Sequence, residues 1–249
     1  MRRVRAATGT AAVAVLLGAV PAAQDQGLVG EIRQIVSFHL SPGSLVQVEQ
    51  IYRQQLLPIY EGITPLLRLR AYHEAESPEP VDLVIVSAYR DMAGMDQAND
   101  MLRRPARGGL SPLRFYDQIS RHTVAHTDQF VEMRPRLSDP VSDQEPPPEI
   151  TVFEYVQLVP AAHDAYEELL AGRVRDFEKD EALYAWSETG RLIVADGWDY
   201  LRTYGLRSLA DWQEYQGRIR AAEFGPDLAG ITMRKKTLVL RRAPEMSVR

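Results

Sequence analysis

Hydrophobic positions along the chain recur with two periods, and these predict strands and helices in an order that occurs twice. Alternating or continuous apolar runs predict strands, whereas apolar residues at every third or fourth position predict amphipathic helices. In the first half we expect strands at 32–40, 67–72, 81–89 and 122–133, and helices over 45–59 and 91–102. In the second half we expect strands at 150–158, 191–195, 198–206 and 231–240, and helices over 166–177 and 209–219. Each half therefore has the order of a ferredoxin-like βαββαβ unit.

The two halves also align with each other in sequence. EIRQIVSFHLSP from Glu31 matches EITVFEYVQLVP from Glu149, at an offset of 118 residues. VDLVIVSAYRDMAGM from Val81 matches WDYLRTYGLRSLADW from Trp198 at an offset of 117, and the strand from His122 matches that from Ile231 at 109. Three blocks in one order with slowly drifting offsets indicate a diverged tandem duplication whose loops differ in length.

Short polar motifs mark the expected ends of these elements. Ser44 with Gln47, and Ser208 with Asp211, have the spacing of a capping box at a helix start. Asp196-Gly197 favours the left-handed backbone angles of a tight hairpin turn. We expect a loop over 103–111 and a short extra helical turn over 113–120.

The chain divides into five segments. Residues 1–23 resemble a signal peptide, because a basic start is followed by the apolar run 11–20 and by small residues. The apolar run is shorter than the roughly 20 residues that a spanning helix needs, although a retained anchor stays open as the alternative. The other expected segments are the first repeat at 30–135, a proline-rich linker at 136–148, the second repeat at 149–244 and a frayed tail at 245–249.

Net charge and cysteine content exclude some classes of binding partner and of stabilising bond. The formal net charge is −5, and it becomes about −8 when the arginines of the leader are removed, so we expect no nucleic-acid partner. The leader itself predicts an exported protein, either periplasmic or secreted. The chain has no cysteine, which rules out disulfides and thiolate metal ligands.

The repeats predict one α+β barrel. An antiparallel sheet with helices on one face leaves its other face to be buried, and here the other repeat can bury it. Two such sheets packed face to face within one chain would close a barrel around a central cavity. Because the duplication supplies both halves, we expect a monomer.

The opening Glu31-Ile32-Arg33, followed by Leu40-Ser41-Pro42-Gly43 and an amphipathic helix, resembles that of NIPSNAP-type domains in the dimeric α+β barrel superfamily. The helix start Ser208-Leu209-Ala210-Asp211-Trp212 adds to the resemblance, whereas Ala161 stands where the second repeat would need the glycine. NIPSNAP-like domains have no accepted catalytic motif to transfer. The wider superfamily includes cofactor-independent and haem-using enzymes, so the resemblance implies a fold and leaves the activity open.

Four of the five histidines lie on or next to strands of the first repeat, and with one aspartate they form the candidate ligand-binding set: His39, His73, His122, His126 and Asp128. On the fourth strand His122, His126 and Asp128 share one face, and if that face lines the cavity, the first repeat holds a site there. Asp128 lies about 7 Å along the strand from His126 and can orient its imidazole. His122 and His126 are about 13 Å apart and cannot hold one metal together, so we expect no metal. A haem would need His39 or His73.

Arginines and aromatic residues are the second set of candidates. Arg68 and Arg70 alternate on the expected second strand, with Arg202 and Arg207 in the matching hairpin, and they can hold an anion. Aromatic residues can shape a pocket for a flat ligand; they are Tyr72, Tyr89, Trp186, Trp198, Tyr200, Tyr204 and Trp212. The chain has no nucleophile elbow, phosphate loop, paired zinc ligands or dinucleotide fingerprint in a supporting context.

Three functional hypotheses follow. The first is an exported NIPSNAP-like barrel that binds a small aromatic or anionic molecule in its cavity, without a cofactor. The second is a cofactor-independent or haem-using monooxygenase or isomerase with His126 and Asp128 in acid–base roles, together with His39 or His73. The third is a structural or interaction module. Side chains that converge on a roomy cavity would favour binding or catalysis, and a solidly packed interior would favour the third.

Overall fold

The computed structural model describes residues 30–76, 81–104, 112–138, 148–177, 185–222 and 226–248. The first repeat comprises β1 (Ile32–Leu40), α1 (Leu45–Ile51), the π-helical η1 (Tyr52–Leu56), α2 (Leu57–Glu61), β2 (Leu66–Glu76), β3 (Leu83–Tyr89), α3 (Met92–Arg103), α4 (Pro112–Ile119) and β4 (Thr123–Met133). The 3₁₀ turn η2 (Pro135–Leu137) follows. The second repeat comprises β5 (Ile150–Leu158), α5 (His163–Phe177), β6 (Trp186–Val194), β7 (Tyr200–Leu206), α6 (Leu209–Ala222), α7 (Pro226–Ile231) and β8 (Thr232–Val248).

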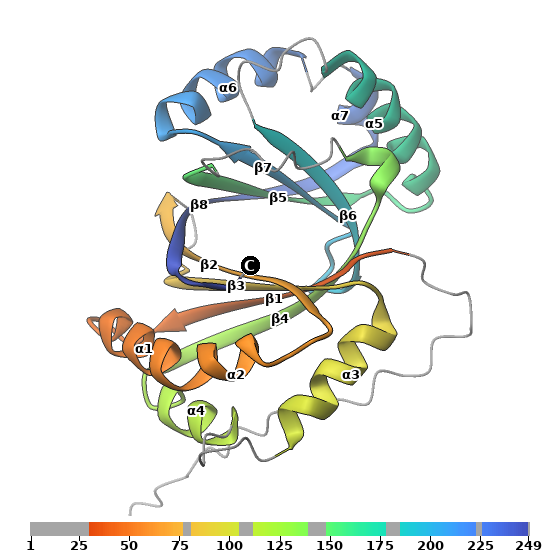
Figure 1. Cartoon of the computed structure of the whole chain (residues 1–249). Helices are drawn as coiled ribbons and strands as arrows, with labels where there is room; N and C mark the ends of the chain where they lie inside the picture. The colour runs from red at the N-terminus through yellow and green to blue at the C-terminus, as the bar shows by residue number, and fades with distance from the viewer. Residues whose placement is uncertain are drawn as a thin grey trace, which may run out of the picture.

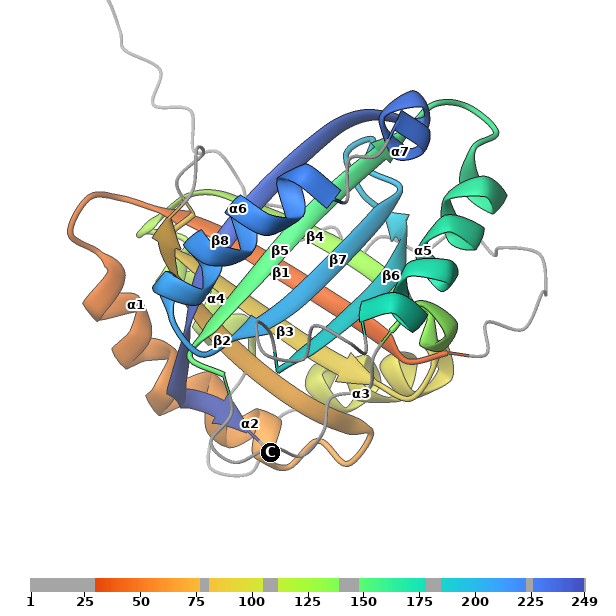
Figure 2. The ribbon, with the colours of Figure 1, turned by 90° about the horizontal axis from the view of Figure 1, so that it is seen from above.

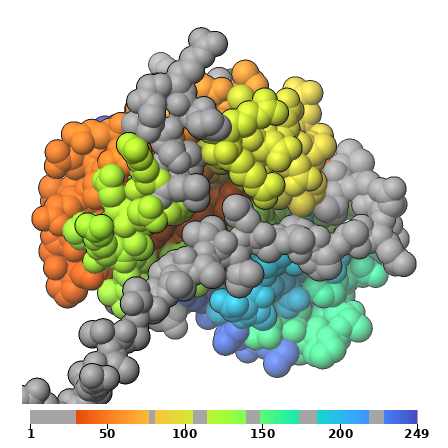
Figure 3. All heavy atoms as spheres, turned by 90° about the horizontal axis from the view of Figure 1, so that it is seen from below, coloured from red at the N-terminus to blue at the C-terminus, as the bar shows by residue number. Residues whose placement is uncertain are grey.

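The strands form one closed antiparallel barrel in the order β1-β3-β2-β8-β5-β7-β6-β4. Helices α1 to α4 lie outside the first sheet and α5 to α7 outside the second (Figure 1), and the strands of the two sheets cross each other in projection (Figure 2). Seen from the first-repeat side, α1, α3 and α4 form the surface (Figure 3). The expected α+β barrel of two ferredoxin-like repeats is therefore confirmed.

The last strand of each repeat joins the two sheets. β4 pairs with β1 and then with β6, where Val131 lies opposite Leu192. β8 pairs with β5 through its first half and with β2 through its second. These two shared strands close the barrel, so that neither sheet has a free edge.

The duplication extends to single hydrogen bonds. Oδ2 of Asp82 accepts from the amide of Leu40 at 2.7 Å, and Oδ2 of Asp199 accepts from the amide of Leu158 at 2.8 Å. The turn after the first strand of each repeat has one left-handed residue, with φ of 79° at Gly43 and 65° at Ala161. The second repeat keeps the backbone conformation although it has lost the glycine.

Each sheet separates an outer core from the inside of the barrel, which we call the lumen. On β1, Ile32, Phe38 and Leu40 pack under the first-repeat helices. Their neighbours Arg33 and Ile35 point into the lumen, because successive side chains of a strand face opposite ways. The lumen has an apolar cluster of its own, which includes Val131, Leu201 and Leu240.

Several local expectations need correction. The tail is not frayed, because β8 continues to Val248, which pairs with Leu69, and Met246 is fully buried in the first-repeat core. The expected linker begins as the ordered turn η2, whose Leu137 packs with the core under α5. The start of α1 has no side-chain cap at Ser44, whereas Oγ of Ser208 accepts from the amide of Asp211 at 3.2 Å.

Other differences concern element limits. β6 begins at Trp186, five residues before the expected start, and the turn at Gly197 (φ 76°) belongs to a longer loop between Val194 and Tyr200. The expected turn at 113–120 is the helix α4. The expected signal peptide, most of the loop 103–111 and the middle of the linker lie outside the described residues. In the described part of the chain, no helix combines the length and apolarity needed to cross a bilayer.

Candidate functional site: the barrel lumen

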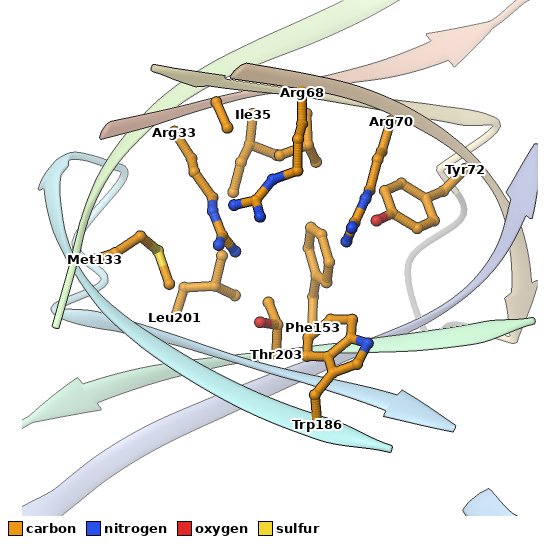
Figure 4. Close-up of a pocket in the computed structure, with 12 residues that line it drawn as sticks. Arg33, Ile35, Arg68, Arg70, Tyr72, Met133, Phe153, Trp186, Leu201 and Thr203 are labelled. Carbon is orange, nitrogen blue, oxygen red and sulfur yellow. The ribbon is translucent and has the colours of Figure 1, made fainter. Parts of the chain in front are cut away.

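A pocket occupies the lumen between the two sheets (Figure 4). Its cavity volume, the space that the centre of a water-sized sphere can reach, is about 20 Å³, whereas the looser space between the lining atoms is about 470 Å³ and includes open solvent. Its lining residues are Arg33, Ile35, Arg68, Arg70, Tyr72, Val86, Ala88, Met133, Phe153, Trp186, Leu201 and Thr203. Guanidinium groups point in from one side, and Phe153 and Trp186 stand on the other (Figure 4).

Strand alternation explains why these side chains meet. Arg68, Arg70 and Tyr72 are alternate residues of β2, and their neighbours Leu69 and Ala71 pack outward in the first core. On β7 the inward residues are Leu201 and Thr203. The strands β1 to β7 thus contribute inward-facing residues to the pocket, and the intervening residues anchor the sheet to its helices.

Two of the arginines belong to a chain of ion pairs that crosses the lumen. Arg33 binds Glu188 with both terminal nitrogens, at 2.6 and 2.7 Å, and its Nε donates to Oε1 of Glu31 at 2.6 Å. Arg68 donates to both oxygens of Glu31, at 2.6 and 2.7 Å. Glu188 comes from the second repeat and the other three from the first, so this chain links the two sheets.

The Arg33–Glu188 pair is buried, so each of its charges needs the other as a partner. Both side chains are only about a tenth exposed, at 11% and 10%. Burial alone lowers the pKa of Arg33, yet the facing carboxylates of Glu188 and Glu31 raise it above its ordinary value. Burial alone raises the pKa of Glu188, yet Arg33, with Arg68 and Arg70 beyond it, brings that pKa below the ordinary value. Both groups are therefore charged at neutral pH, and each depends on the other.

Arg70 is different because it contacts no carboxylate among the residues that the structure describes. Its Nε is buried and has no hydrogen-bond partner there. Arg242 of β8 pairs with Tyr72 in the sheet register, which places it on the lumen side next to β2. Its Nε is also buried without a partner. Burial and the charge of Arg70 lower the pKa of Arg242, and Tyr72 opposes this. The two arginines repel each other, and neither has a carboxylate of the described chain in direct contact.

The opposite wall is aromatic. The ring of Phe153 meets that of Tyr72 edge to face, with centroids 5.9 Å apart. Trp186 lies against the backbone of Gly205, where an added Cβ would come within 2.3 Å of its Nε1. Glycine is required at this position because the indole occupies the space that any side chain would fill.

The histidines do not line this pocket. His126 and Asp128 lie on the outer face of β4: His126 stacks on Phe38, which packs under the helices, and its Nε2 is 3.5 Å from Oδ2 of Asp128. The condition for a histidine site here, that this face lines the cavity, is not met, because the inward residues of β4 are Val131 and Met133.

The other histidines are dispersed. Nε2 of His73 lies 2.8 Å from Oε1 of Glu49 on α1, and Nδ1 of His122 lies 3.3 Å from Oγ of Ser44. His39 has the inward parity of β1, but it lies six residues, about 20 Å, beyond Arg33. None of the five histidines offers an imidazole to the pocket, so the lumen does not fit a histidine-ligated haem. Within the described ranges, no three histidine, aspartate or glutamate side chains are grouped to hold a metal.

The remaining predicted residues also divide by face. Arg68, Arg70, Tyr72 and Trp186 line the pocket. Arg202 faces the opposite way, where its Nη1 lies 3.4 Å from Oε2 of Glu154, and Arg207 is exposed. Tyr200 packs under α5, and Trp212 lies on α6 and packs in the outer core between that helix and the second sheet.

Sequence reasoning missed Arg33, Glu31, Glu188, Phe153 and Arg242. Arg33 and Phe153 are inward on strands whose limits were predicted correctly, so alternation on those strands was the signal for them. Glu188 lies in the part of β6 that the prediction left out, and Arg242 in the part of β8 beyond its predicted end.

Solved structures share this fold. A candidate monooxygenase from Lactobacillus acidophilus NCFM has a TM-score of 0.61 at 10% identity, covering 86% of this chain and 94% of its own. One from Fusobacterium nucleatum has a TM-score of 0.64 at 9% identity, with 86% and 93% covered. A chlorite dismutase variant from Candidatus Nitrospira defluvii has a TM-score of 0.59 at 12% identity, with 90% and 97% covered. No family model and no curated protein matches the sequence.

The chain therefore has the same closed α+β barrel fold as these proteins. At these identities the likeness establishes architecture alone, and the activities of these neighbours belong to them. The function has to be argued from the lumen.

Proposed function

We propose that this protein is an exported NIPSNAP-like α+β barrel that binds a small aromatic or anionic molecule in its lumen. The observation that carries the proposal is the pocket itself, in which cationic side chains of the first sheet face aromatic side chains of the second. Small-molecule sites are typically concave and largely apolar, with a few polar groups that converge on them.

The arrangement of charge supports binding more than a structural role. A solidly packed interior would be filled by apolar side chains, whereas this one keeps three arginines at its pocket. Buried charges without partners cost stability, and proteins keep such costs mainly at functional sites. The export part of the proposal is supported by the basic and apolar pattern of residues 1–23, and the NIPSNAP part by the opening of the first repeat.

A second candidate is an enzyme of the same superfamily, either cofactor-independent or haem-using. It is favoured by the pair His126 and Asp128, with a separation of 3.5 Å on the outer face of β4. Absorption spectra of the purified protein before and after adding haem test this candidate. A stoichiometric Soret band that is lost on substituting one histidine would support the haem-using enzyme. If the protein does not respond to haem, only the cofactor-independent enzyme remains of this candidate.

Tryptophan fluorescence tests the lumen proposal. Nitrobenzoate is aromatic, anionic and a quencher, and it should reduce the emission of the wild-type protein saturably. Trp186→Phe should lose most of this quenching, because Trp186 lines the pocket. The matched control Trp212→Phe, on α6 and in the outer core of the second repeat, should retain it. Quenching that survives Trp186→Phe and disappears in Trp212→Phe would contradict the proposal.

A further inference from the structure

Four arginines enter the lumen, but only two carboxylates contact them. Glu31 and Glu188 neutralise Arg33 and Arg68 through short, partly bidentate pairs. Arg70 and Arg242 contact no carboxylate within the described ranges. Two guanidinium groups are therefore left without a carboxylate in direct contact, although Arg70 acts on Glu188 from a distance.

The two remaining arginines lie close in the sheet. Arg70 and Tyr72 are on the same face of β2, and Tyr72 is the register partner of Arg242 on β8. Cross-strand partners and their diagonal neighbours on one face are about 5–8 Å apart at Cβ, so two long arginines can meet on one ligand group. A guanidinium presents its donors as a planar fork that matches the oxygens of a carboxylate or phosphate.

Arg70 also points toward the aromatic wall. In Figure 4 its guanidinium extends across the pocket toward Phe153 and Trp186. A ligand held by Arg70 at its anionic end would therefore place its other end against these rings. Phe153 meets Tyr72, which ties the aromatic wall to the strand that carries Arg70.

From this juxtaposition we infer that Arg70 and Arg242 form an oxyanion clamp for an aromatic carboxylate or aromatic phosphate, whose ring packs on Phe153 and Trp186. The inference rests on the proposed lumen function and narrows its ligand class. Arg33 and Arg68 hold the two sheets together through Glu31 and Glu188, and they are not part of the clamp.

The test is calorimetric titration of the purified protein with naphthoate, with naphthyl phosphate and with neutral naphthamide. Arg70→Met and Arg242→Met should each weaken binding of the preferred anion about tenfold to 100-fold, because a hydrogen bond to a charged group contributes about 1.5–3 kcal/mol. Binding of naphthamide should change less than twofold. The control Arg241→Met removes the neighbouring arginine of β8, whose side chain is half exposed and pairs with Glu149 outside the lumen; it should leave all three affinities unchanged.

The outcomes separate the two claims. Equal loss of anion and naphthamide binding, or anion binding unaffected by both substitutions, would overturn the clamp while the lumen function stands. No binding of any probe to the wild-type protein would overturn the lumen function itself. Whichever of naphthoate and naphthyl phosphate binds more tightly identifies the ligand as an aromatic carboxylate or an aromatic phosphate, provided that its binding depends on both arginines.

A second readout needs no ligand. Removal of either arginine relieves the repulsion between them, so Arg70→Met and Arg242→Met should raise the thermal midpoint at low salt, and Arg241→Met should not. Sulfate should raise the midpoint of the wild-type protein more than that of either variant. If a methionine variant does not fold, Arg242→Gln removes the charge and keeps a polar side chain. A midpoint lowered in every charge-removing variant, with no difference in the sulfate response, would count against the clamp.

Discussion

The two halves of the barrel share a backbone, but they present opposite chemistry to the lumen. In the sheet registers, Arg33 of the first repeat occupies the place of Thr151, Arg70 that of Glu188 and Arg68 that of Trp186. Ile35 likewise corresponds to Phe153, and Met133 to Arg242. One duplicated scaffold has therefore become a cationic wall facing an aromatic wall.

The outer faces differ in another way. His126 of the first repeat corresponds to Lys235 of the second, and Lys235 pairs with a buried Glu154, whereas His126 is exposed by more than a third beside Asp128. What the repeats keep is backbone geometry: the aspartates at the strand ends and the left-handed turn recur. A duplication of this kind preserves turns and registers, and it leaves side chains free to diverge where a site can form.

The largest expected effect comes from breaking the pair that joins the two walls. Glu188→Gln should lower the free energy of unfolding by about 3–5 kcal/mol, because it leaves the charge of Arg33 buried and half-paired. Urea denaturation at neutral pH measures this loss. Glu168→Gln, at an exposed position of α5, is the matched control and should change stability by less than 0.5 kcal/mol. A similar loss in both variants would mean that the pair does not hold the walls together.

Acid should weaken the same pair. The pKa of Glu188 is lower in the folded chain than its ordinary value, which is about 4.3 for an unfolded chain. Its contribution to stability is therefore fully present above that value and is lost as the pH falls through the lower, folded pKa. Unfolding free energy measured from pH 6 down to pH 2 should fall less steeply in Glu188→Gln than in the wild-type protein. Parallel curves would contradict this linkage.

A single methyl group tests whether the aromatic wall needs its glycine. Gly205→Ala would place a Cβ 2.3 Å from Nε1 of Trp186 and should cost about 1–3 kcal/mol as the indole is displaced. The corresponding residue of the first repeat is Ala88, which already carries that methyl group at the pocket. Ala88→Gly should cost only about 0.5–1 kcal/mol. Denaturation curves together with near-ultraviolet dichroism of the tryptophans would detect the difference, and equal costs would contradict it.

The smallest effect concerns the conserved left-handed turn. No atom lies within 4 Å of a Cβ added at Gly43, so Gly43→Ala should cost only the conformational penalty, roughly 1–2 kcal/mol. Ala161→Gly makes the reverse change at φ 65° and should stabilise the protein by roughly 0.5–1 kcal/mol. Thermal midpoints of the two variants should move in opposite directions. Movement in the same direction would show that the turns are not equivalent.

The fold was predictable because its signals are periodic and occur twice. Strand limits such as 32–40 and 150–158 were predicted correctly, and the offsets between repeats reappear in the sheet registers. The continuation of β8 past Leu240 was missed, because Arg241, Arg242 and Pro244 interrupt the apolar pattern and the strand is stabilised by β2, far away in sequence.

The site was harder to predict because it depends on which face of each strand turns inward. Alternation groups His126 and Asp128 correctly on one face, although His122 lies in the turn before β4, and it does not say which face the helices cover. Arg68 and Arg70 were selected by residue type and do line the lumen. Glu31, which pairs with Arg68, precedes β1, and Arg242 lies on β8, so both are far from β2 in sequence and only the folded sheet brings them beside it.

The most direct test of the account is to locate a ligand in a crystal of the protein soaked with bromonaphthoate. The anomalous signal of bromine marks its position without reference to the rest of the map. We predict a peak in the lumen near Phe153 and Trp186, with the carboxylate facing Arg70 and Arg242. Peaks only outside the barrel, for example beside His126 or between the second sheet and its helices, would contradict the claim that the lumen is the binding site.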